Sequence, residues 1–548
     1  MATVSRTDSQ CLICVFAACA LLYEMVIATT LVLLFGDVIY YFSLTVAFFV
    51  LFMGIGSGIS RGVEGQALLV LVLVELVIAL LGASSSFLLL YVAAYTRSGP
   101  YILLTAFIYI ALIGILIGME LPLLFRLTEG QGDPQKRFGF LLIADYLGSL
   151  IGSLLFAFLL LPRLDITGTS LAAGGVNLLG VVYAIARVGF PMRQRMALLA
   201  AATACLVAFA AVGLEVPRIQ AAVDEELFAI SDHTEIIQNF RTRYQKVVVT
   251  LTPGADIEAE EDNGKYRALV GTLARSPSDT WIAVYLNGYL QALSPLQSST
   301  DFYHHAFVHP TMLLARQRRR VLVLGGGDGL PAKEVAKYVE VQDIVNVDLD
   351  GEWVEFVKND PLMRAHNFDS LRDPRLRLIV ADAFKWVRES TERFDVILVD
   401  FPEGIDVPLA RSYSTQFLKD LKRLLSDDGV IAFQANFFDN SAFWCIVKTM
   451  LDAGYSVIPH HTKDPEEQEG FMLLSKKPLD VAGFDQKVAS YPFLDPRLMV
   501  SERELRAFGD PRSLTRHIAG LEINTFFRPS FLAYYRANFP WKLSIGAD

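Results

Sequence analysis

Four aspartates recur in the second half of the chain, each beside the end of a short apolar run. They are Asp328 in VLVLGGGDG, Asp348 at the end of IVNVD, Asp382 after LRLIVA, and Asp400 at the end of FDVILVD. Apolar runs of this length, separated by helical stretches, are typical of a parallel, doubly wound sheet, whose ligand lies at the carboxyl ends of the strands. The spacing therefore predicts that the four carboxylates gather at one edge of a Rossmann-like sheet and carry its chemistry.

The turn after the first of these strands narrows the class of ligand. Its glycines, Gly325 to Gly327, let the backbone approach a ligand closely, and Asp348 is placed to accept hydrogen bonds from ribose hydroxyls. The turn has the sequence G-G-G-D, not G-x-G-x-x-G, and no Walker lysine follows it. Because an acid in the turn repels a diphosphate and suits a sulfonium cation, the pattern favours a derivative of S-adenosylmethionine over a dinucleotide.

Other segments must position this edge. Period-two alternation at 242–253 and 281–293 predicts strands of a small β domain that precedes the main sheet. Segments 429–435 and 470–478 fit later strands of the main sheet. We therefore expect three domains, namely a transmembrane domain at 1–217, a small β domain at 218–300, and a methyltransferase-type α/β catalytic domain with a C-terminal extension at 301–548.

Long apolar runs fill the first domain. A helical bilayer crossing takes about 20 apolar residues, and seven runs are long enough, at 11–34, 40–59, 68–94, 101–125, 140–161, 170–186 and 196–214. They predict a multi-pass bundle of seven helices in the cell (inner) membrane, with the lipid bilayer as partner. Basic loop residues place the N-terminus in the cytoplasm, whereas seven crossings would put the soluble half outside. The side of the catalytic domain stays open.

Four acids lie inside these runs, at Glu24, Glu75, Glu120 and Asp145. An ionisable group in hydrocarbon is costly, so each is a functional candidate. For Glu24 and Glu120, near likely segment ends, we favour contact with the interface or pairing with another helix. For Asp145 we favour a buried hydrogen bond between helices, because the nearby Gly148 and Gly152 have the spacing of close helix contacts.

Composition argues against other kinds of partner. The net charge is −10 at pH 7 and no basic stripe is present, so nucleic acid is not expected, whereas a polycation would be attracted. Of the five cysteines only Cys445 lies in the soluble half, and the eight histidines show no metal-ligand spacing. We expect no metal and no redox cofactor.

Taken together, the motifs of the soluble half resemble the spermidine synthase family of polyamine aminopropyltransferases, in particular its bacterial membrane-fused branch. The matching elements are the strand with Gln245, LNGYLQ ending at Gln291, the stretch Phe302-Tyr303-His304, GGGDG, VDLD, DPRLRLIVADAF and the pair Val399-Asp400. The resemblance implies transfer of an aminopropyl group from decarboxylated S-adenosylmethionine to a diamine such as putrescine, which gives spermidine and methylthioadenosine.

The resemblance also implies roles for single residues. The donor would be held by Gln245, Asp328, Asp348, Asp382 and Ala383, and the donor and acceptor pocket would be lined by Gln291, Tyr303, His304 and Glu403. Asp400 would be the catalytic base. An alkylammonium, with a pKa of about 10, must lose a proton before its nitrogen can attack the carbon beside the sulfonium.

Two departures from the family pattern concern the acceptor. The usual Asp-x-x-Asp-Pro is Asp400-Phe401-Pro402-Glu403-Gly404 here, so the second carboxylate, which normally grips the acceptor amine, stands on a longer side chain. Upstream of Tyr303, Ser299-Thr300 replaces an Asp-Glu pair, and His305 stands where Glu is usual. The acceptor therefore differs from putrescine, or the pocket is resized for the same diamine.

Two other classes of function remain open. A methyltransferase would use the same sheet and turn, but its cofactor's carboxylate would need a basic or amide partner where this chain offers acids. A non-catalytic polyamine sensor or transporter would lack the base, whereas Asp400 is present. By resemblance we also expect a homo-oligomer, a dimer.

Overall fold

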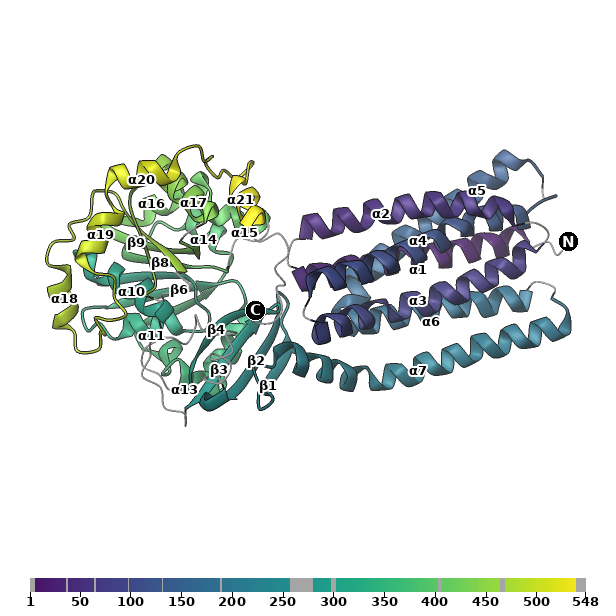
Figure 1. Cartoon of the computed structure of the whole chain (residues 1–548), viewed down its shortest axis with the longest axis horizontal. Helices are drawn as coiled ribbons and strands as arrows, with labels where there is room; N and C mark the ends of the chain where they lie inside the picture. The colour runs from purple at the N-terminus through teal and green to yellow at the C-terminus, as the bar shows by residue number, and fades with distance from the viewer. Residues whose placement is uncertain are drawn as a thin grey trace. The chain divides into compact units, whose positions relative to one another are not determined.

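The computed structural model describes residues 5–35, 38–63, 66–96, 98–130, 132–187, 190–256, 279–296, 302–402, 407–438, 440–463 and 469–538. Its contacts divide the chain into two compact units, with the boundary between Leu227 and Phe228. The first unit is helical and the second contains both sheets (Figure 1). The boundaries of the three expected domains stay predictions.

The helices of the first unit are long and apolar. They are α1 (Arg6–Phe35), α2 (Val38–Ile59), α3 (Ala67–Thr96), α4 (Gly99–Leu127), α5 (Pro134–Leu155), α6 (Leu161–Arg187) and α7 (Met192–Phe228). By length and composition, six helical segments of the described residues can cross a membrane, so the expected count of seven is not confirmed. The difference arises at Pro134–Arg187, a 54-residue segment that includes two of the expected runs. Inside it, Asp165 leaves helical geometry, with φ 57° and ψ −169°.

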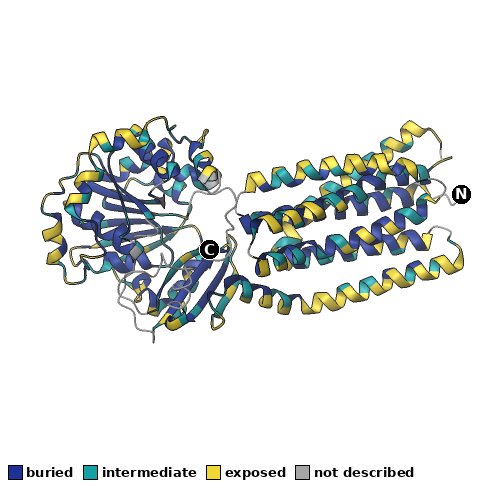
Figure 2. Ribbon diagram, viewed as in Figure 1, coloured by how far each residue is buried: buried dark blue, intermediate teal, exposed yellow. Residues whose placement is uncertain are grey.

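Helix α1 is the centre of this unit and packs against α2, α3, α4, α5 and α6. Glycines allow the backbones of neighbouring helices to approach closely. A Cβ on Gly148 of α5 would lie 2.1 Å from the Cys14 carbonyl oxygen of α1, and one on Gly152 would lie 2.5 Å from that of Ala18. The close packing expected at these two glycines is therefore confirmed. Many apolar residues of α2, α5 and α7 are exposed, and much of the ribbon of these helices has the colour of exposed residues (Figure 2), as expected of helices that face lipid.

The larger sheet of the second unit has seven strands among the described residues, in the order β10-β11-β9-β8-β5-β6-β7. Their bounds are β5 (Arg320–Gly325), β6 (Asp343–Asp348), β7 (Leu376–Val380), β8 (Phe394–Asp400), β9 (Leu425–Phe437), β10 (Ser456–His461) and β11 (Glu469–Ser475). The sheet is mixed, so the expectation of a parallel sheet is wrong for one strand, since β11 pairs antiparallel with β9 and β10. The connection from β10 is too short for the crossover that a parallel pair needs.

Helices cover both faces of this sheet, as in a doubly wound fold (Figure 1). One face packs on α14 (Ala383–Glu389), α16 (Thr415–Leu424), α17 (Ser441–Asp452) and α21 (Ser530–Asn538). The other packs on α10 (Phe302–Leu314), α11 (Leu330–Ala336) and α18 (Phe484–Ser490). The remaining helices of this unit are α12 (Gly351–Asn359), α13 (Pro361–His366), α15 (Val407–Ala410), α19 (Glu502–Phe508) and α20 (Pro511–Ile518). The strands are apolar on both faces because both are buried.

A second, antiparallel sheet has the strand order β1-β2-β3-β4. Its strands are β1 (Glu235–Arg241), β2 (Lys246–Pro253), β3 (Thr280–Leu286) and β4 (Tyr289–Pro295). Asn287 and Gly288 connect β3 to β4 with φ of 52° and 88°, the signature of a two-residue hairpin turn. Apolar side chains of β2 and β3 pack on Trp353, Val354 and Val357 of α12, which brings this sheet next to the carboxyl edge of the larger one.

Candidate active site

Parallel register brings the strand-end acids to one edge of the larger sheet. Gly325 at the end of β5 pairs with Asp400 at the end of β8, and Asp348 at the end of β6 pairs with Val380 of β7. Gly325 has φ 82°, and a Cβ there would lie 1.9 Å from the carbonyl oxygen of Asp400. Only glycine fits at this turn.

Asp348 lies on this edge at the end of β6, next to the glycine turn that follows β5. Its Oδ1 accepts a 2.9 Å hydrogen bond from the backbone N–H of Asp350, and its Oδ2 would be 2.7 Å from a Cβ on Gly327. Burial raises the pKa of Asp348 to about 6, and the charges of Asp328 and Asp350 add to the rise. The carboxylates of this edge therefore repel one another, and a bound cation would relieve that repulsion.

Gln245 reaches the same edge from the smaller sheet. Its Nε2 donates a 2.9 Å hydrogen bond to Oδ2 of Asp350, which also accepts from the Thr242 hydroxyl at 2.5 Å. The other oxygen of Asp350 caps α12 by accepting from the N–H of Trp353. Asp350 and Thr242 were missed by sequence reasoning, although the helix N-cap two residues after Asp348 was a usable signal.

Asp400 is held by helix α10. The Tyr303 hydroxyl donates a 2.6 Å hydrogen bond to its Oδ1, and the His304 ring lies edge-on to the Tyr303 ring at 4.8 Å. Burial raises the pKa of Asp400 to about 6. The His304 charge and the Tyr303 hydrogen bond lower this pKa, whereas Asp328 and Asp348 raise it. The predicted grouping of Asp400, Tyr303 and His304 is present in the structure.

Asp328 and Asp382 each accept a hydrogen bond from a backbone N–H nearby in the chain. Asp328 Oδ1 accepts from the N–H of Leu330 at 2.9 Å. Asp382 caps α14, whose first residue is Ala383, by accepting from the N–H of Phe384 at 2.8 Å, and its Oδ2 lies 3.4 Å from Nη2 of Arg411. A helix-capping role for Asp382 is therefore established, and its contact with a donor stays a prediction, as does that of Ala383.

Arg411 is a third residue that sequence reasoning missed. Its guanidinium lies 4.1 Å from the centroid of the Phe384 ring, and Phe384 in turn stacks on Phe401 at 6.0 Å. The cation is thus engaged by Asp382 and by an aromatic face. No sequence pattern pointed to Arg411, because it lies on a short 3₁₀ turn far along the chain from Asp382.

Other predicted pocket residues lie elsewhere or cannot be placed. Gln291 is exposed on β4, where its Nε2 is 3.5 Å from the carbonyl oxygen of Tyr289. Glu403, Ser299 and Thr300 lie outside the described residues. His305 is fully buried against the backbone of Asp495, so its departure from the family pattern concerns packing beneath α10.

His305, His309 and Glu334 offer ligand atoms within 4.8 Å of one another, a grouping the histidine spacing did not indicate. His309 bonds Tyr338 and Glu334 at 2.9 Å each. Glu334 also pairs with Lys337 at 2.5 Å and with Lys333 at 3.9 Å. Because two ammonium groups already face this carboxylate, the arrangement is that of a buried polar network and disfavours a divalent cation. The expectation of no metal stays a prediction.

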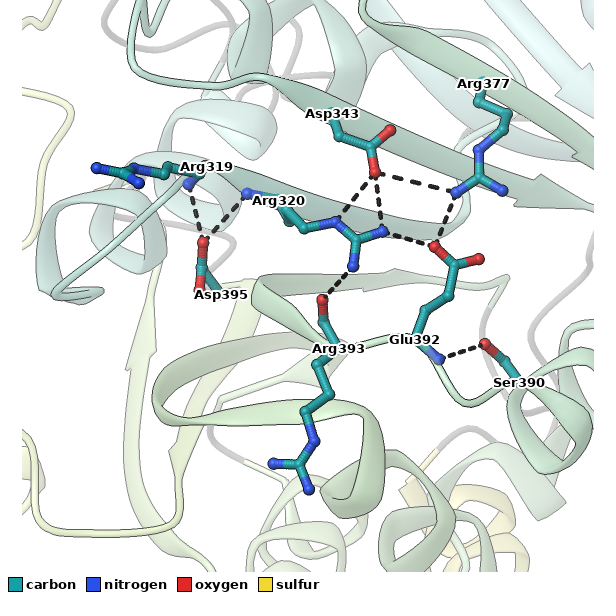
Figure 3. Close-up of polar contacts among 8 residues, drawn as sticks. All are labelled: Arg319, Arg320, Asp343, Arg377, Ser390, Glu392, Arg393 and Asp395. Atoms are coloured by element: carbon teal, nitrogen blue, oxygen red, sulfur yellow. Dashed lines mark hydrogen bonds and ion pairs between the residues drawn. The ribbon is translucent and has the colours of Figure 1, made fainter.

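The opposite edge of the sheet has a different charge balance (Figure 3). Arg320 at the start of β5 pairs with Asp343 at 2.9 Å and with Glu392 at 2.6 Å, and Arg377 pairs with Glu392 at 2.8 Å. Acids and arginines therefore neutralise each other at the amino ends of the strands. At the carboxyl ends the acids face one another, which is the edge where ligands of such sheets bind.

Comparisons with known proteins point to one family. Residues 300–463 match the spermine/spermidine synthase domain. The chain is 33% identical over 489 residues to polyamine aminopropyltransferase 1 of Ralstonia nicotianae, covering 86% of this chain and 85% of that protein. It is 32% identical to polyamine aminopropyltransferase 2 of Aquifex aeolicus, with 93% and 95% covered, and 29% identical to the polyamine aminopropyltransferase of Leptospira interrogans, with 95% and 96% covered.

These matches extend over both units, because the Leptospira protein aligns along 527 residues. The chain is therefore an enzyme, a transferase that belongs to the spermine/spermidine synthase family of polyamine aminopropyltransferases.

Proposed function

We propose that this protein transfers the aminopropyl group of decarboxylated S-adenosylmethionine to a diamine, with putrescine as the expected acceptor, and releases spermidine and methylthioadenosine. The observation that carries the proposal is the electrostatic repulsion among Asp328, Asp348 and Asp400, which lie at one edge of the sheet. The donor brings a sulfonium and a primary ammonium and no carboxylate, so its charges complement this edge. Membership in the aminopropyltransferase family supports the same reaction.

The donor would lie across the ends of β5 and β6. Asp348 accepts hydrogen bonds from the ribose hydroxyls, and Gln245 keeps Asp350 beside it through the 2.9 Å hydrogen bond. The glycine turn lets the backbone contact the nucleoside. Asp328, Asp382 and Ala383 complete the donor side, and Tyr303 and His304 border the acceptor.

In the transfer step, the acceptor ammonium first loses a proton to the Asp400 carboxylate. Its nitrogen then attacks the methylene carbon beside the sulfonium, the C–S bond breaks, and the bonding electrons neutralise the sulfur. Because Asp400 has a pKa of about 6, it is ionised at neutral pH and can orient the ammonium as well as accept the proton. The Tyr303 hydrogen bond fixes the orientation of the carboxylate.

Methyl transfer fits this edge less well. S-Adenosylmethionine carries a carboxylate that would face Asp328, Asp348 and Asp400. Arg411, a cation near this edge, is engaged by Asp382 and Phe384. The choice of acceptor would depend on Glu403, whose longer side chain we expect to hold the distal ammonium.

The test is product analysis by mass spectrometry on the purified full chain in detergent. Decarboxylated S-adenosylmethionine is supplied with putrescine, cadaverine or spermidine, and S-adenosylmethionine is supplied in parallel. We expect methylthioadenosine and an aminopropylated amine. S-Adenosylhomocysteine instead would establish methyl transfer, and bound donor without either product would favour a sensing or transport role.

A further inference from the structure

A cluster of polar side chains lies in the interior of the helical unit. It contains Tyr23 of α1, Glu75 of α3, Glu120 of α4 and Asn177 of α6, with exposed fractions of 0%, 0%, 3% and 1%. The four residues come from α1 and from three helices that pack against it. Glu120 therefore pairs with another helix, as expected, and does not reach the interface.

The contacts of this cluster leave several oxygens unused. Asn177 Nδ2 donates a 3.1 Å hydrogen bond to Glu75 Oε2, and the carboxyl groups of Glu75 and Glu120 lie within hydrogen-bonding reach of each other. Among the described residues no partner is present for Glu75 Oε1, Glu120 Oε1, Asn177 Oδ1 or the Tyr23 hydroxyl. Buried polar atoms without partners are rare in folded proteins and call for an explanation.

The Tyr23 ring packs on α3, the helix that contains Glu75. It lies flat on α3 at Gly82, where an added Cβ would be 2.2 Å from Cε1 and 2.5 Å from Cζ. Gly82 is about two helical turns from Glu75 and therefore lies on the same face of α3. The hydroxyl interacts electrostatically with both Glu75 and Glu120.

The unused atoms share one chemical property, because all four are oxygens that can accept hydrogen bonds. Helix α3 contains no lysine or arginine, and α4 contains only Arg126, whose Nη1 donates to the Val63 carbonyl oxygen. A ligand that donates several hydrogen bonds and carries a positive charge would therefore suit the cluster. A primary ammonium, with three N–H donors, meets that requirement.

A third carboxyl extends the cluster outward. Asp145 of α5 is half-buried and interacts electrostatically with Glu120. Its helix is held against α1 by the Gly148 and Gly152 contacts, so the three carboxyls come from three adjacent helices. Acidic groups are therefore present both at the partly exposed Asp145 and at the buried pair, Glu75 and Glu120, and a cation could interact with each of them.

We propose that the helical unit contains a binding site for the ammonium group of a primary amine, formed by Tyr23, Glu75, Glu120 and Asn177. The class of ligand rests on the proposed function, since the amines of that reaction are primary alkylammonium ions. The site is distinct from the sheet edge, and its presence does not depend on which amine accepts the aminopropyl group.

The test is equilibrium binding of radiolabelled putrescine to the purified full chain in nanodiscs. The wild-type protein should bind amine at the sheet edge and at a second site. Glu75→Gln and Glu120→Gln, which keep size and remove charge, should each weaken the second site by at least about tenfold. The matched control is Glu24→Gln, because Glu24 is a half-buried carboxyl of α1. It should leave binding and transfer unchanged.

Tyr23→Phe separates binding from folding. The Tyr23 hydroxyl has no partner in the described structure, so its removal should leave thermal stability unchanged or higher while it weakens putrescine binding several-fold. A residue with only a packing role would not give that combination. Unchanged putrescine affinity in Tyr23→Phe, Glu75→Gln and Glu120→Gln would overturn the site.

Two further results would overturn the assignment to an ammonium. One is the absence of second-site binding in the wild-type protein. The other is stabilisation by Na⁺ that depends on Glu75 while putrescine neither binds nor competes, which would identify a metal-ion site. Transfer activity is measured on the same preparation. Absent transfer with intact second-site binding would reject the proposed reaction and leave this site standing.

Discussion

The two acidic clusters of this protein differ in how their carboxylates find hydrogen-bond donors. At the sheet edge, Asp328, Asp348 and Asp382 each accept the backbone N–H of the residue two positions later, at 2.8 to 2.9 Å. In the helical unit, Glu75 and Glu120 lie more than one turn inside their helices, where backbone N–H groups are already bonded to carbonyls one turn earlier.

The difference explains why the clusters suit different tasks. A loop at a strand end has backbone donors to spare, so it can stabilise ionised carboxylates before any ligand arrives. A helix interior offers none, so its carboxyls depend on side chains of other helices or on a ligand. In the proposed account, the sheet edge is therefore organised before its ligand arrives, whereas the helical cluster is completed by the cation that it binds.

Removing the charge of Asp400 gives the largest expected effect. Asp400→Asn should lower kcat by roughly 10²- to 10⁴-fold, because the acceptor loses both its base and its orienting charge. Donor affinity should stay within about twofold, since the role proposed for Asp400 concerns the acceptor. Steady-state kinetics and donor titration check this. Turnover near that of the wild type would remove Asp400 from the reaction.

The two edges of the sheet can be compared directly. Asp348→Ala should weaken donor binding by roughly 10- to 100-fold, because a hydrogen bond to a charged group contributes about 1.5 to 3 kcal/mol. Asp343→Ala, at the opposite edge, removes a carboxylate from the arginine network and should leave donor affinity unchanged. Calorimetric titration measures both, and equal effects of the two substitutions would contradict the assignment of the edges.

The glycine turn is expected to affect stability. Gly325→Ala places a Cβ 1.9 Å from the Asp400 carbonyl oxygen at φ 82°. It should lower the free energy of unfolding of the second unit by about 1 to 3 kcal/mol. Thermal unfolding checks this, with Gly520→Ala as control, because φ is also positive at Gly520 (75°) but nothing lies within 4 Å of its added Cβ. An equally large loss of stability in Gly520→Ala would show that the positive φ, and not the contact with the Asp400 carbonyl oxygen, causes the effect.

The smallest expected effect concerns pH. The proposed reaction uses ionised Asp400 as its base, so kcat/KM should fall as the pH drops below about 6. The Tyr303 hydrogen bond lowers the pKa of Asp400, so Tyr303→Phe should move this acid limb to higher pH by about one pH unit. An acid limb that stays in place, or that moves to lower pH, would contradict this coupling.

The sequence predicted the catalytic edge better than the helical cluster. Strand-end acids are visible because each follows an apolar run, and parallel register then brings Gly325 and Asp400 together. The pairing of Glu75, Glu120, Asn177 and Tyr23 depends on how four helices rotate against one another, which no local pattern encodes. For the same reason Arg411 and the antiparallel direction of β11 appeared only in the structure.

The most direct measurement is calorimetric titration of the purified full chain with decarboxylated S-adenosylmethionine and, separately, with S-adenosylmethionine. The two ligands differ by one carboxylate, which would face the acids of the sheet edge. We predict at least about tenfold tighter binding of the decarboxylated ligand. Equal affinity, or tighter binding of S-adenosylmethionine, would contradict the claim that this edge is built for a donor without a carboxylate.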